Sequence, residues 1–299
     1  MTTSLASHGG RPRARGLGLV PALAGLVRLA HTVFALPFAL AGALFVGMNN
    51  PGWGTLGWLA LAMAGARSLA MALNRLVDAE IDARNPRTAT RELPSGRLSR
   101  PQVWAFSTLS LGVLLIAVSQ LSRPTWFLWV VPVALFVAYP YAKRVTSLCH
   151  FVLGVTIGIA PVGAWVAVTG SVAWTPLLLG IGVAAWIAGF DIIYALLDLD
   201  FDRAHGVHSF PARFGPRIAL RTTRALHTLA IVLLAAAGLT AGAQWPYAIG
   251  VTVCAVVLLV ENLTVDPSRT DRINAAFNQA NMLLSVIFAA AVVAEVALR

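Results

Sequence analysis

Long apolar segments, separated by short polar breaks, recur along almost the whole of this sequence. A helix that crosses a bilayer needs about 20 mostly apolar residues, and lipid offers its backbone no hydrogen-bond partner outside the segment. Hydrophobic residues make up 58% of the chain, more than a soluble globular domain contains. We therefore expect an all-α, multi-pass membrane bundle with about nine transmembrane helices, at roughly residues 18–47, 54–77, 101–121, 126–142, 148–169, 173–197, 218–240, 243–262 and 275–298.

The basic residues predict how this bundle lies in the membrane. Most of the 22 Lys and Arg residues fall in the N-terminal tail and in the loops after the second, fourth, sixth and eighth segments. Loops rich in Lys and Arg stay on the cytoplasmic side, so the N-terminus and these loops are expected at the cytoplasmic face of the cytoplasmic (inner) membrane. A disordered tail, residues 1–16, is expected to precede a single transmembrane domain, residues 17–299. Because the charge of +10 flanks membrane helices, nucleic acid is not an expected partner.

Acidic residues gather in two short windows, each at the cytoplasmic end of an even-numbered segment. Seven of the 12 acidic residues are Asp78, Glu80 and Asp82 in the first window and Asp191, Asp198, Asp200 and Asp202 in the second. Residues four apart share a helix face, so Asp78 and Asp82 form one stripe with Asn74. The second stripe contains Asp198 and Asp202, with Asp191 two turns before them. Glu80 and Asp200 point away from the stripes and are expected to face water.

Two charged residues lie within the apolar segments themselves. Arg67 precedes the first stripe by about two helical turns, and Asp191 begins the second stripe. An ionised side chain at the centre of a membrane helix costs about 2.5–3.5 kcal/mol unless it faces a polar cavity. Arg67 and Asp191 are therefore functional candidates by default.

Carboxylates on facing helices, without His or Cys at ligand spacing, suit hard divalent cations. Mg²⁺ takes one or two carboxylates and completes its coordination with water and substrate phosphate oxygens. The two stripes can thus hold Mg²⁺ ions with a diphosphate between them. Arg67, Lys143 and nearby loop arginines can supply further positive charge to the phosphate oxygens. Lys143 is the only lysine in the chain, which makes a general solubilising role a poor explanation for it.

Four motifs occur in order along the sequence: Asn74-xxx-Asp78-xxx-Asp82 with Arg67 upstream, Tyr139-Pro-Tyr-Ala-Lys143-Arg144, Asp191-xx-Tyr194-xxx-Asp198-xxx-Asp202, and a tail from Gly206 to Gly215 that includes Ser209. Together they resemble the UbiA superfamily of intramembrane prenyltransferases. The resemblance covers nearly the whole chain, and both aspartate motifs are in the right order on even-numbered segments. Residues 85–96 also resemble the loop after the first motif in the branch that prenylates hydroxybenzoate-like acids.

The resemblance implies a Mg²⁺-dependent transfer of a polyprenyl group from polyprenyl diphosphate to a ring carbon of a hydroxy-aromatic acid, such as 4-hydroxybenzoate, in ubiquinone or menaquinone biosynthesis. The lipid bilayer and the apolar bundle would house the isoprenoid tail. Carried over residue by residue, it implies catalytic roles for Asp191 and for Asp78, Asp82, Asp198 and Asp202, of which the last four bind the metal. It also implies contact with diphosphate by Arg67, Asn74, Lys143 and Arg144, and substrate contacts by Tyr139, Tyr194 and Ser209.

Several points stay open at this stage. Some relatives carry an Asn where Ile187 stands here, so that polar contact is absent or supplied elsewhere. The acceptor carboxylate should pair with an arginine, for which Arg28, Arg67 and Arg144 are candidates, and His31 can bind or deprotonate the acceptor. Dihydroxynaphthoate, haem or chlorophyll prenylation on the same fold are the alternative activities. A membrane transporter is the alternative class, although transporters are not expected to concentrate carboxylates in two stripes at one face.

Overall fold

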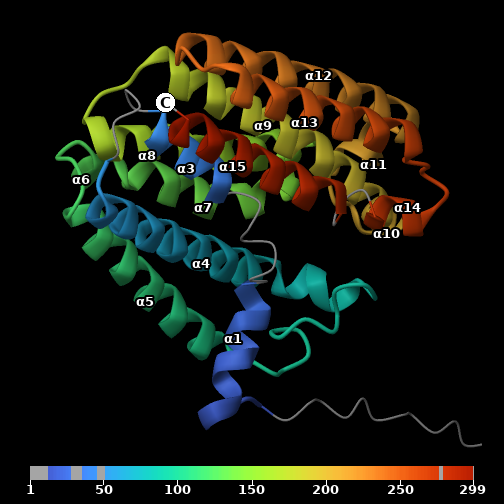
Figure 1. The fold of residues 1–299 in the computed structure, drawn as a ribbon. Coiled ribbons are helices and arrows are strands. Elements are labelled where there is room, and N and C mark those ends of the chain that lie inside the picture. Colours follow the sequence, from blue (N-terminus) through green and yellow to red (C-terminus); the bar gives the residue numbers. More distant parts are fainter. Residues whose placement is uncertain (1–12, 28–35, 46–50, 276–278, 299) are drawn as a thin grey trace, which may run out of the picture.

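The computed structural model describes residues 13–27, 36–45, 51–275 and 279–298, and every regular element within these ranges is a helix. This agrees with the all-α expectation (Figure 1). The elements are a 3₁₀ turn η1 (Gly16–Gly18), α1 (Leu19–Val27), α3 (Leu36–Leu44), α4 (Trp53–Arg84), α5 (Arg100–Ser119), α6 (Thr125–Leu128), α7 (Val130–Val145), α8 (Cys149–Thr169), α9 (Trp174–Ala195), a 3₁₀ turn η2 (Leu196–Asp198), α10 (Leu199–His205), α11 (Phe210–Phe214), α12 (Pro216–Thr240), α13 (Trp245–Thr264), α14 (Thr270–Ala275) and α15 (Asn281–Ala297).

Seven helical spans within the described residues are long and apolar enough to cross a membrane. Two of these spans combine several elements: α6 continues into α7, and α9 continues through η2 into α10. Counted in this way, the seven spans correspond to the second to eighth predicted segments. The first predicted segment contains α1 and α3, with residues between them that lie outside the described ranges. The last segment contains α15, a shorter apolar helix. The count of nine therefore stays a prediction.

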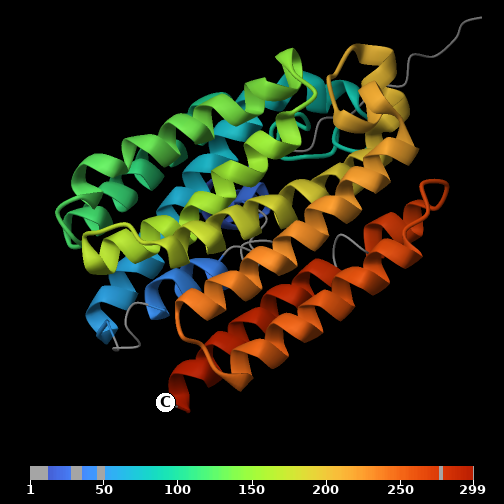
Figure 2. The same cartoon turned by 90° about the horizontal axis from the view of Figure 1, so that it is seen from above.

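The long helices run side by side, and α9 lies inside the bundle (Figure 2). It packs against α8 on one side and α12 on the other, while α4 packs against α5 and α7. The loop after α4, residues 85–99, and the short helices α10 and α11 lie at the same end of the bundle in both views (Figures 1 and 2). This arrangement brings the ends of α4 and α9, which carry the two aspartate motifs, to one place.

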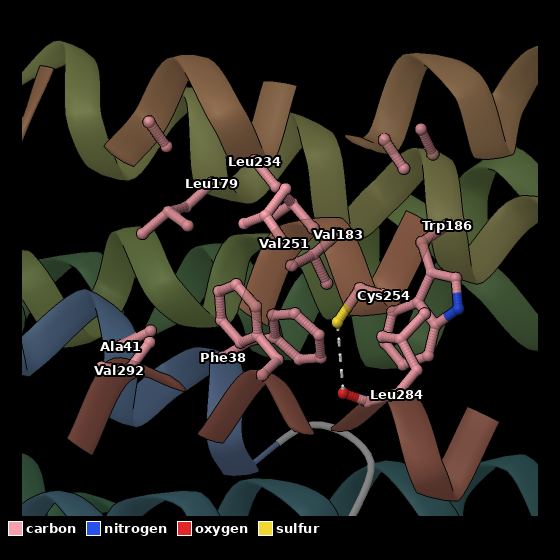
Figure 3. Close-up of a cluster of buried hydrophobic side chains, with 14 of the residues drawn as sticks. Phe38, Ala41, Leu179, Val183, Trp186, Leu234, Val251, Cys254, Leu284 and Val292 are labelled. Carbon is pink, nitrogen blue, oxygen red and sulfur yellow. Dashed lines mark hydrogen bonds between the residues drawn. The ribbon is translucent and has the colours of Figure 1, made fainter. Parts of the chain in front are cut away.

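An apolar core on α3, α9, α12, α13 and α15 fixes the position of α9. Figure 3 shows Phe38 and Trp186 within this core, and their ring centroids lie 5.0 Å apart. Phe38 also stacks on Phe288 at 4.5 Å. The indole N–H of Trp186 donates to the side-chain oxygen of Asn281 over 2.9 Å, so this buried polar group is satisfied. The core thereby ties α9 to the C-terminal helix α15.

Glycines allow α8 and α9 to touch through their backbones. A Cβ at Gly158 would lie 2.4 Å from the carbonyl oxygen of Gly180, and one at Gly154 would lie 2.3 Å from that of Ala184. Gly154 and Gly158 form a GxxxG pair, and small residues at this spacing allow close packing of membrane helices. The close contact fixes the position of α9 along α8, and with it the position of the aspartates at the end of α9.

We expect Gly158→Ala to lower the thermal stability of the protein in detergent. The added methyl must push two helix backbones apart, which costs about 1–3 kcal/mol. Gly163→Ala on the same helix is the matched control, because a Cβ there meets nothing within 4 Å and the higher helix propensity of Ala should be neutral or stabilising. Unfolding followed by Trp fluorescence would measure both. Equal melting temperatures for the two variants would show that the backbone contact is not tight.

Candidate active site

A cavity of about 310 Å³ lies where the ends of α4, α7 and α9 meet the start of α8. Its lining combines polar side chains with the apolar side chains of Leu153, Ile157, Ile187 and Phe190. Ile187 is thus an apolar lining residue at the position where some relatives carry Asn. Every predicted site residue that the structure describes lines the cavity, apart from Arg144. These residues are Arg67, Asn74, Asp78, Asp82, Tyr139, Lys143, Asp191, Tyr194, Asp198, Asp202 and Ser209.

Asp78 lies at the centre of the first motif and is 2% exposed. Its Oδ2 accepts a hydrogen bond from the Asn74 amide, 2.8 Å away, and pairs with Lys143 Nζ at 2.7 Å. The Asn74 contact follows from the helical spacing of four residues, whereas the Lys143 contact joins α4 to α7. Within the described part of the chain, Asp78 Oδ1 is buried without a hydrogen-bond partner. A buried carboxylate oxygen in this state is suited to a cation.

Asp82 is held by the loop that follows α4. Arg91 Nη1 donates to both carboxylate oxygens at 2.7 Å, and Arg75 Nη1 lies 3.8 Å from Oδ2. The Thr88 hydroxyl donates to the backbone oxygen of Asp82 over 3.0 Å, which fixes the turn back towards the helix. The end of α4 and its loop therefore form one charged unit.

The same loop also binds the second motif. Arg87 Nε donates to Asp198 Oδ1 over 2.8 Å, Arg87 Nη2 pairs with Asp198 Oδ2, and the Asn85 amide donates to Oδ1 over 2.8 Å. Arg87 Nη1 donates to the Tyr194 hydroxyl over 2.6 Å. Burial acts to lower the pKa of Arg87, but its bonds to Asp198 and Tyr194 outweigh burial and raise that pKa, so the guanidinium stays charged. The loop thus joins the two aspartate motifs directly.

The remaining acidic residues divide as their spacing predicts. Asp202 on α10 is buried at 7% exposure and lines the cavity. Nearby Ser209 caps α11 by accepting a hydrogen bond from the Ala212 N–H. Glu80 and Asp200 do not belong to the cavity lining: the Glu80 side chain is 73% exposed and pairs with Arg100 at 3.7 Å, and Asp200 is exposed. These two residues provide natural controls for the aspartates of the cavity.

The donor chemistry of the cavity fits Mg²⁺ that arrives with a phosphate group. Among the described residues, no three Asp, Glu, His or Cys side chains lie close enough to hold a metal by themselves. Mg²⁺ needs only one or two carboxylates when phosphate oxygens and water complete its coordination. Asp78, with its unpartnered oxygen, and Asp82, Asp198 and Asp202 supply hard oxygen ligands of this kind.

Comparison with known proteins gives the family of the chain. Residues 35–287 match the family model described as the UbiA prenyltransferase family. The chain belongs to this family. Since its described residues also contain seven spans apolar and long enough to cross a bilayer, this UbiA-family chain is an integral membrane protein. The expectation drawn from the two aspartate motifs is confirmed at the level of family and fold.

Individual relatives of this UbiA-family chain agree with the assignment. It is 32% identical over 220 residues to the mitochondrial 4-hydroxybenzoate polyprenyltransferase of Aedes aegypti. This match covers 72% of the chain but only half the length of that relative. The apo structure of a UbiA homolog from Aeropyrum pernix K1 has a TM-score of 0.81 and 32% identity, and the match covers 88% of this chain and 97% of that one. A UbiA homolog from Archaeoglobus fulgidus bound to GPP and Mg²⁺ shares the fold, with a TM-score of 0.67 and 20% identity. That match covers 92% of this chain and 99% of the homolog.

Arg144 lies outside the main cavity of this UbiA-family chain. Its Nη2 donates to the backbone oxygen of Val77 over 2.6 Å, and its guanidinium lies 5.8 Å from the Tyr141 ring centroid. It borders an adjoining pocket of about 210 Å³ together with Arg84. Lys143 lines both pockets. Arg144 lines only the adjoining one, because neighbouring residues on a helix point about 100° apart. Arg28 and His31 lie outside the described residues, so their roles stay predictions.

The sequence did not identify six polar residues of the cavity as site residues: Arg75, Asn85, Arg87, Thr88, Arg91 and His150. Arg87 and Arg91 were expected only as unspecified loop arginines, Asn85 and Thr88 only as part of a family-like loop, and Arg75 and His150 were not singled out. His150 Nδ1 lies 2.6 Å from Asp191 Oδ2. Arg87 and His150 have partners that are distant in the sequence, and Arg91 lies beyond the end of α4, so helical periodicity gives no signal for these three residues.

Proposed function

We propose that this UbiA-family chain transfers a polyprenyl group from polyprenyl diphosphate to a ring carbon of 4-hydroxybenzoate or a related hydroxy-aromatic acid, with Mg²⁺, in quinone biosynthesis. The observation that carries the proposal is the single cavity that collects both aspartate motifs together with Lys143, Arg87 and Arg91. The name of the Aedes aegypti relative and the GPP and Mg²⁺ bound to the Archaeoglobus fulgidus homolog support the acceptor, the donor and the metal.

Acidic and basic residues of the cavity have different roles in breaking the allylic C–O bond. Mg²⁺ bound by the aspartates would neutralise the diphosphate and stabilise the negative charge that grows on it as the bond breaks. Lys143 and Arg91 now pair with Asp78 and Asp82, and Arg87 pairs with Asp198. With the carboxylates bound to metal, these three cations would be free to hydrogen-bond the phosphate oxygens. The cavity therefore contains carboxylates that can balance the charge of Mg²⁺ and cationic side chains that can balance the charge of the diphosphate.

Apolar side chains protect the allylic cation that forms next. Leu153, Ile157, Ile187 and Phe190 line the cavity. An apolar wall excludes water, which would otherwise capture the cation in place of the aromatic ring. The rings of Tyr139 and Tyr194 also border the cavity, and aromatic faces attract cations. For the acceptor carboxylate, the described candidates are Arg67 in the cavity and Arg144 in the adjoining pocket.

The placement of the chain in the membrane is part of the proposal. The loops that bear the arginines lie at the cavity end of the bundle, which supports a cytoplasmic position for this end in the inner membrane. We also propose one transmembrane domain, residues 17–299, after a basic tail. The described end of that tail is tied down, because Ala14 N donates to Arg97 O over 2.9 Å and Ala14 O accepts from the Gln102 amide over 3.0 Å.

An acceptor screen tests the function. Purified protein in detergent, given Mg²⁺, a polyprenyl diphosphate and 4-hydroxybenzoate, should yield a product heavier by the prenyl group, detected by mass spectrometry. Dihydroxynaphthoate is the parallel acceptor that separates the two quinone branches. A transporter would form no prenylated product, so the absence of product with every aromatic acceptor would reject the proposal.

A further inference from the structure

His150 and Asp191 form a hydrogen-bonded pair in the cavity. The proposed function as stated so far assigns no role to His150. His150 is in the first turn of α8 and is 5% exposed, while Asp191 is on α9 with a side chain that is 24% exposed. The Nδ1 to Oδ2 distance is 2.6 Å. Both residues line the same cavity as the aspartate motifs. Asp191 is therefore fixed on one side and open to the cavity on the other.

A second contact determines which imidazole nitrogen carries the proton. The backbone N–H of Phe210 donates to His150 Nε2 over 3.2 Å, so Nε2 presents its lone pair. A neutral imidazole then carries its proton on Nδ1, where it donates to Asp191. The backbone of α11 thus selects the tautomer, and the tautomer holds Asp191 as an oriented carboxylate.

His150 also joins three segments around the cavity. Phe210 follows Ser209, the N-cap of α11, and His208 N donates to the Lys143 backbone oxygen over 2.8 Å. The Cys149 thiol donates to His208 O over 3.5 Å. The histidine therefore lies where α8, α9 and the segment before α11 meet. A small displacement of its ring would move the Asp191 carboxylate.

We propose that His150 is a positioning residue that holds Asp191 as the acceptor of the aromatic ring proton, an inference that rests on the proposed function. After the allylic cation bonds to the ring, the substituted carbon still carries a hydrogen. This C–H bond breaks, its electron pair returns to the ring and restores aromaticity, and the proton bonds to an Asp191 oxygen. The neutral carboxylic acid then releases the proton to water. His150 keeps its own proton on Nδ1 throughout.

Two substitutions of His150 separate positioning from proton transfer. His150→Leu removes both hydrogen bonds. His150→Gln can replace both, because its amide N–H can donate to Asp191 and its amide oxygen can accept from Phe210 N–H, but an amide cannot carry the proton. Kinetics with 4-hydroxybenzoate and with the same acid deuterated at the ring carbons beside the hydroxyl would report the proton-removal step.

For His150→Leu we expect kcat to fall by about 10²-fold, since misplacing a catalytic group by an ångström has effects of this size. The deuterium isotope effect on kcat should rise because proton removal becomes slower than the earlier steps, and KM for the prenyl donor should change little. His150→Gln should recover kcat to within about fivefold and return the isotope effect towards that of the wild type.

Several results would overturn the inference. Wild-type kcat and isotope effect in His150→Leu would show that Asp191 does not depend on the histidine. A Gln variant as slow as the Leu variant would assign the proton transfer to the imidazole itself. If His150→Leu fails to fold, Asp191→Asn provides the second test, and an active Asn variant would reject Asp191 as proton acceptor. Wild-type protein without prenylated product would instead reject the proposed function, and this inference with it.

Discussion

Asp78→Ala and Asp198→Ala are each expected to lower kcat/KM for prenyl transfer by about 10³-fold or more. Each substitution removes a carboxylate that would hold Mg²⁺ against the diphosphate, and single groups that stabilise transition-state charge contribute about 10²–10³-fold. Each also leaves cations without their counter-charge: Lys143 loses its 2.7 Å partner in one variant and Arg87 loses its ion pair in the other. Steady-state rates with polyprenyl diphosphate and 4-hydroxybenzoate would measure the loss.

The chain offers a matched control for each substitution. Glu80→Ala removes a carboxylate of the same helix as Asp78, and Asp200→Ala removes one close to Asp198 in the sequence, but both controls lie outside the cavity and are exposed. We expect both to retain activity within about twofold, because exposed ion pairs contribute about 0–1 kcal/mol. EDTA should abolish wild-type activity, and added Mg²⁺ should restore it. Activity in Asp78→Ala comparable to that in Glu80→Ala would reject the metal assignment.

The helices and the aspartate stripes could be predicted from the sequence because both have a local cause. Apolar length predicts a membrane span, and a spacing of four residues predicts a shared face, as the 2.8 Å bond from Asn74 to Asp78 shows. The exclusion of Glu80 from the cavity follows from the same rule. Helical spacing could also have separated Arg144 from Lys143. Adjacent residues on a helix point in different directions, and Arg144 lines the adjoining pocket and not the main cavity.

The loop contacts could not be predicted in this way. Arg87 and Arg91 lie beyond the end of α4. Local hydrogen bonds close the turn that follows Asn85, but the bond from the Asn85 amide to Asp198, 113 residues away, places that turn against the second motif. Arg87 pairs with Asp198, 111 residues away, and His150 pairs with Asp191, 41 residues away. Helical periodicity contains no information about such distances. Arg87 and His150 could therefore not be predicted as site residues, because their contacts depend on how distant segments meet.

The pairing of arginines with aspartates has a consequence for the order in which ligands bind. Arg91 contacts Asp82 at 2.7 Å, and Arg87 holds Asp198 with two donors. Metal alone would have to displace these arginines without giving them a new partner. A diphosphate supplies that partner, so Mg²⁺ and the donor should bind together more tightly than either binds alone. The arginines are then groups that exchange one anion for another during the reaction cycle.

We expect Arg87→Ala and Arg91→Ala each to lower kcat/KM by about 10²-fold, mainly through a higher KM for the prenyl diphosphate. A hydrogen bond to a charged group contributes about 1.5–3 kcal/mol, and each variant loses at least one to the phosphate oxygens. Steady-state kinetics at several donor concentrations would measure the change. Arg100→Ala is the control, because Arg100 is near the same loop but its 60% exposed side chain pairs only with the exposed Glu80 at 3.7 Å among the ion pairs of the described residues.

The Mg²⁺ dependence of the same variants tests whether the arginines act on the substrate or only on the aspartates. If they merely neutralise the carboxylates of the resting protein, their removal frees Asp82 or Asp198, so the Mg²⁺ concentration for half-maximal rate should fall while the donor KM stays at its wild-type value. If they move to the phosphate oxygens, the donor KM should rise whatever the Mg²⁺ concentration. An unchanged donor KM in both variants would therefore contradict the exchange of partners, and a rise of KM in Arg100→Ala to the same extent would assign the effect to net charge.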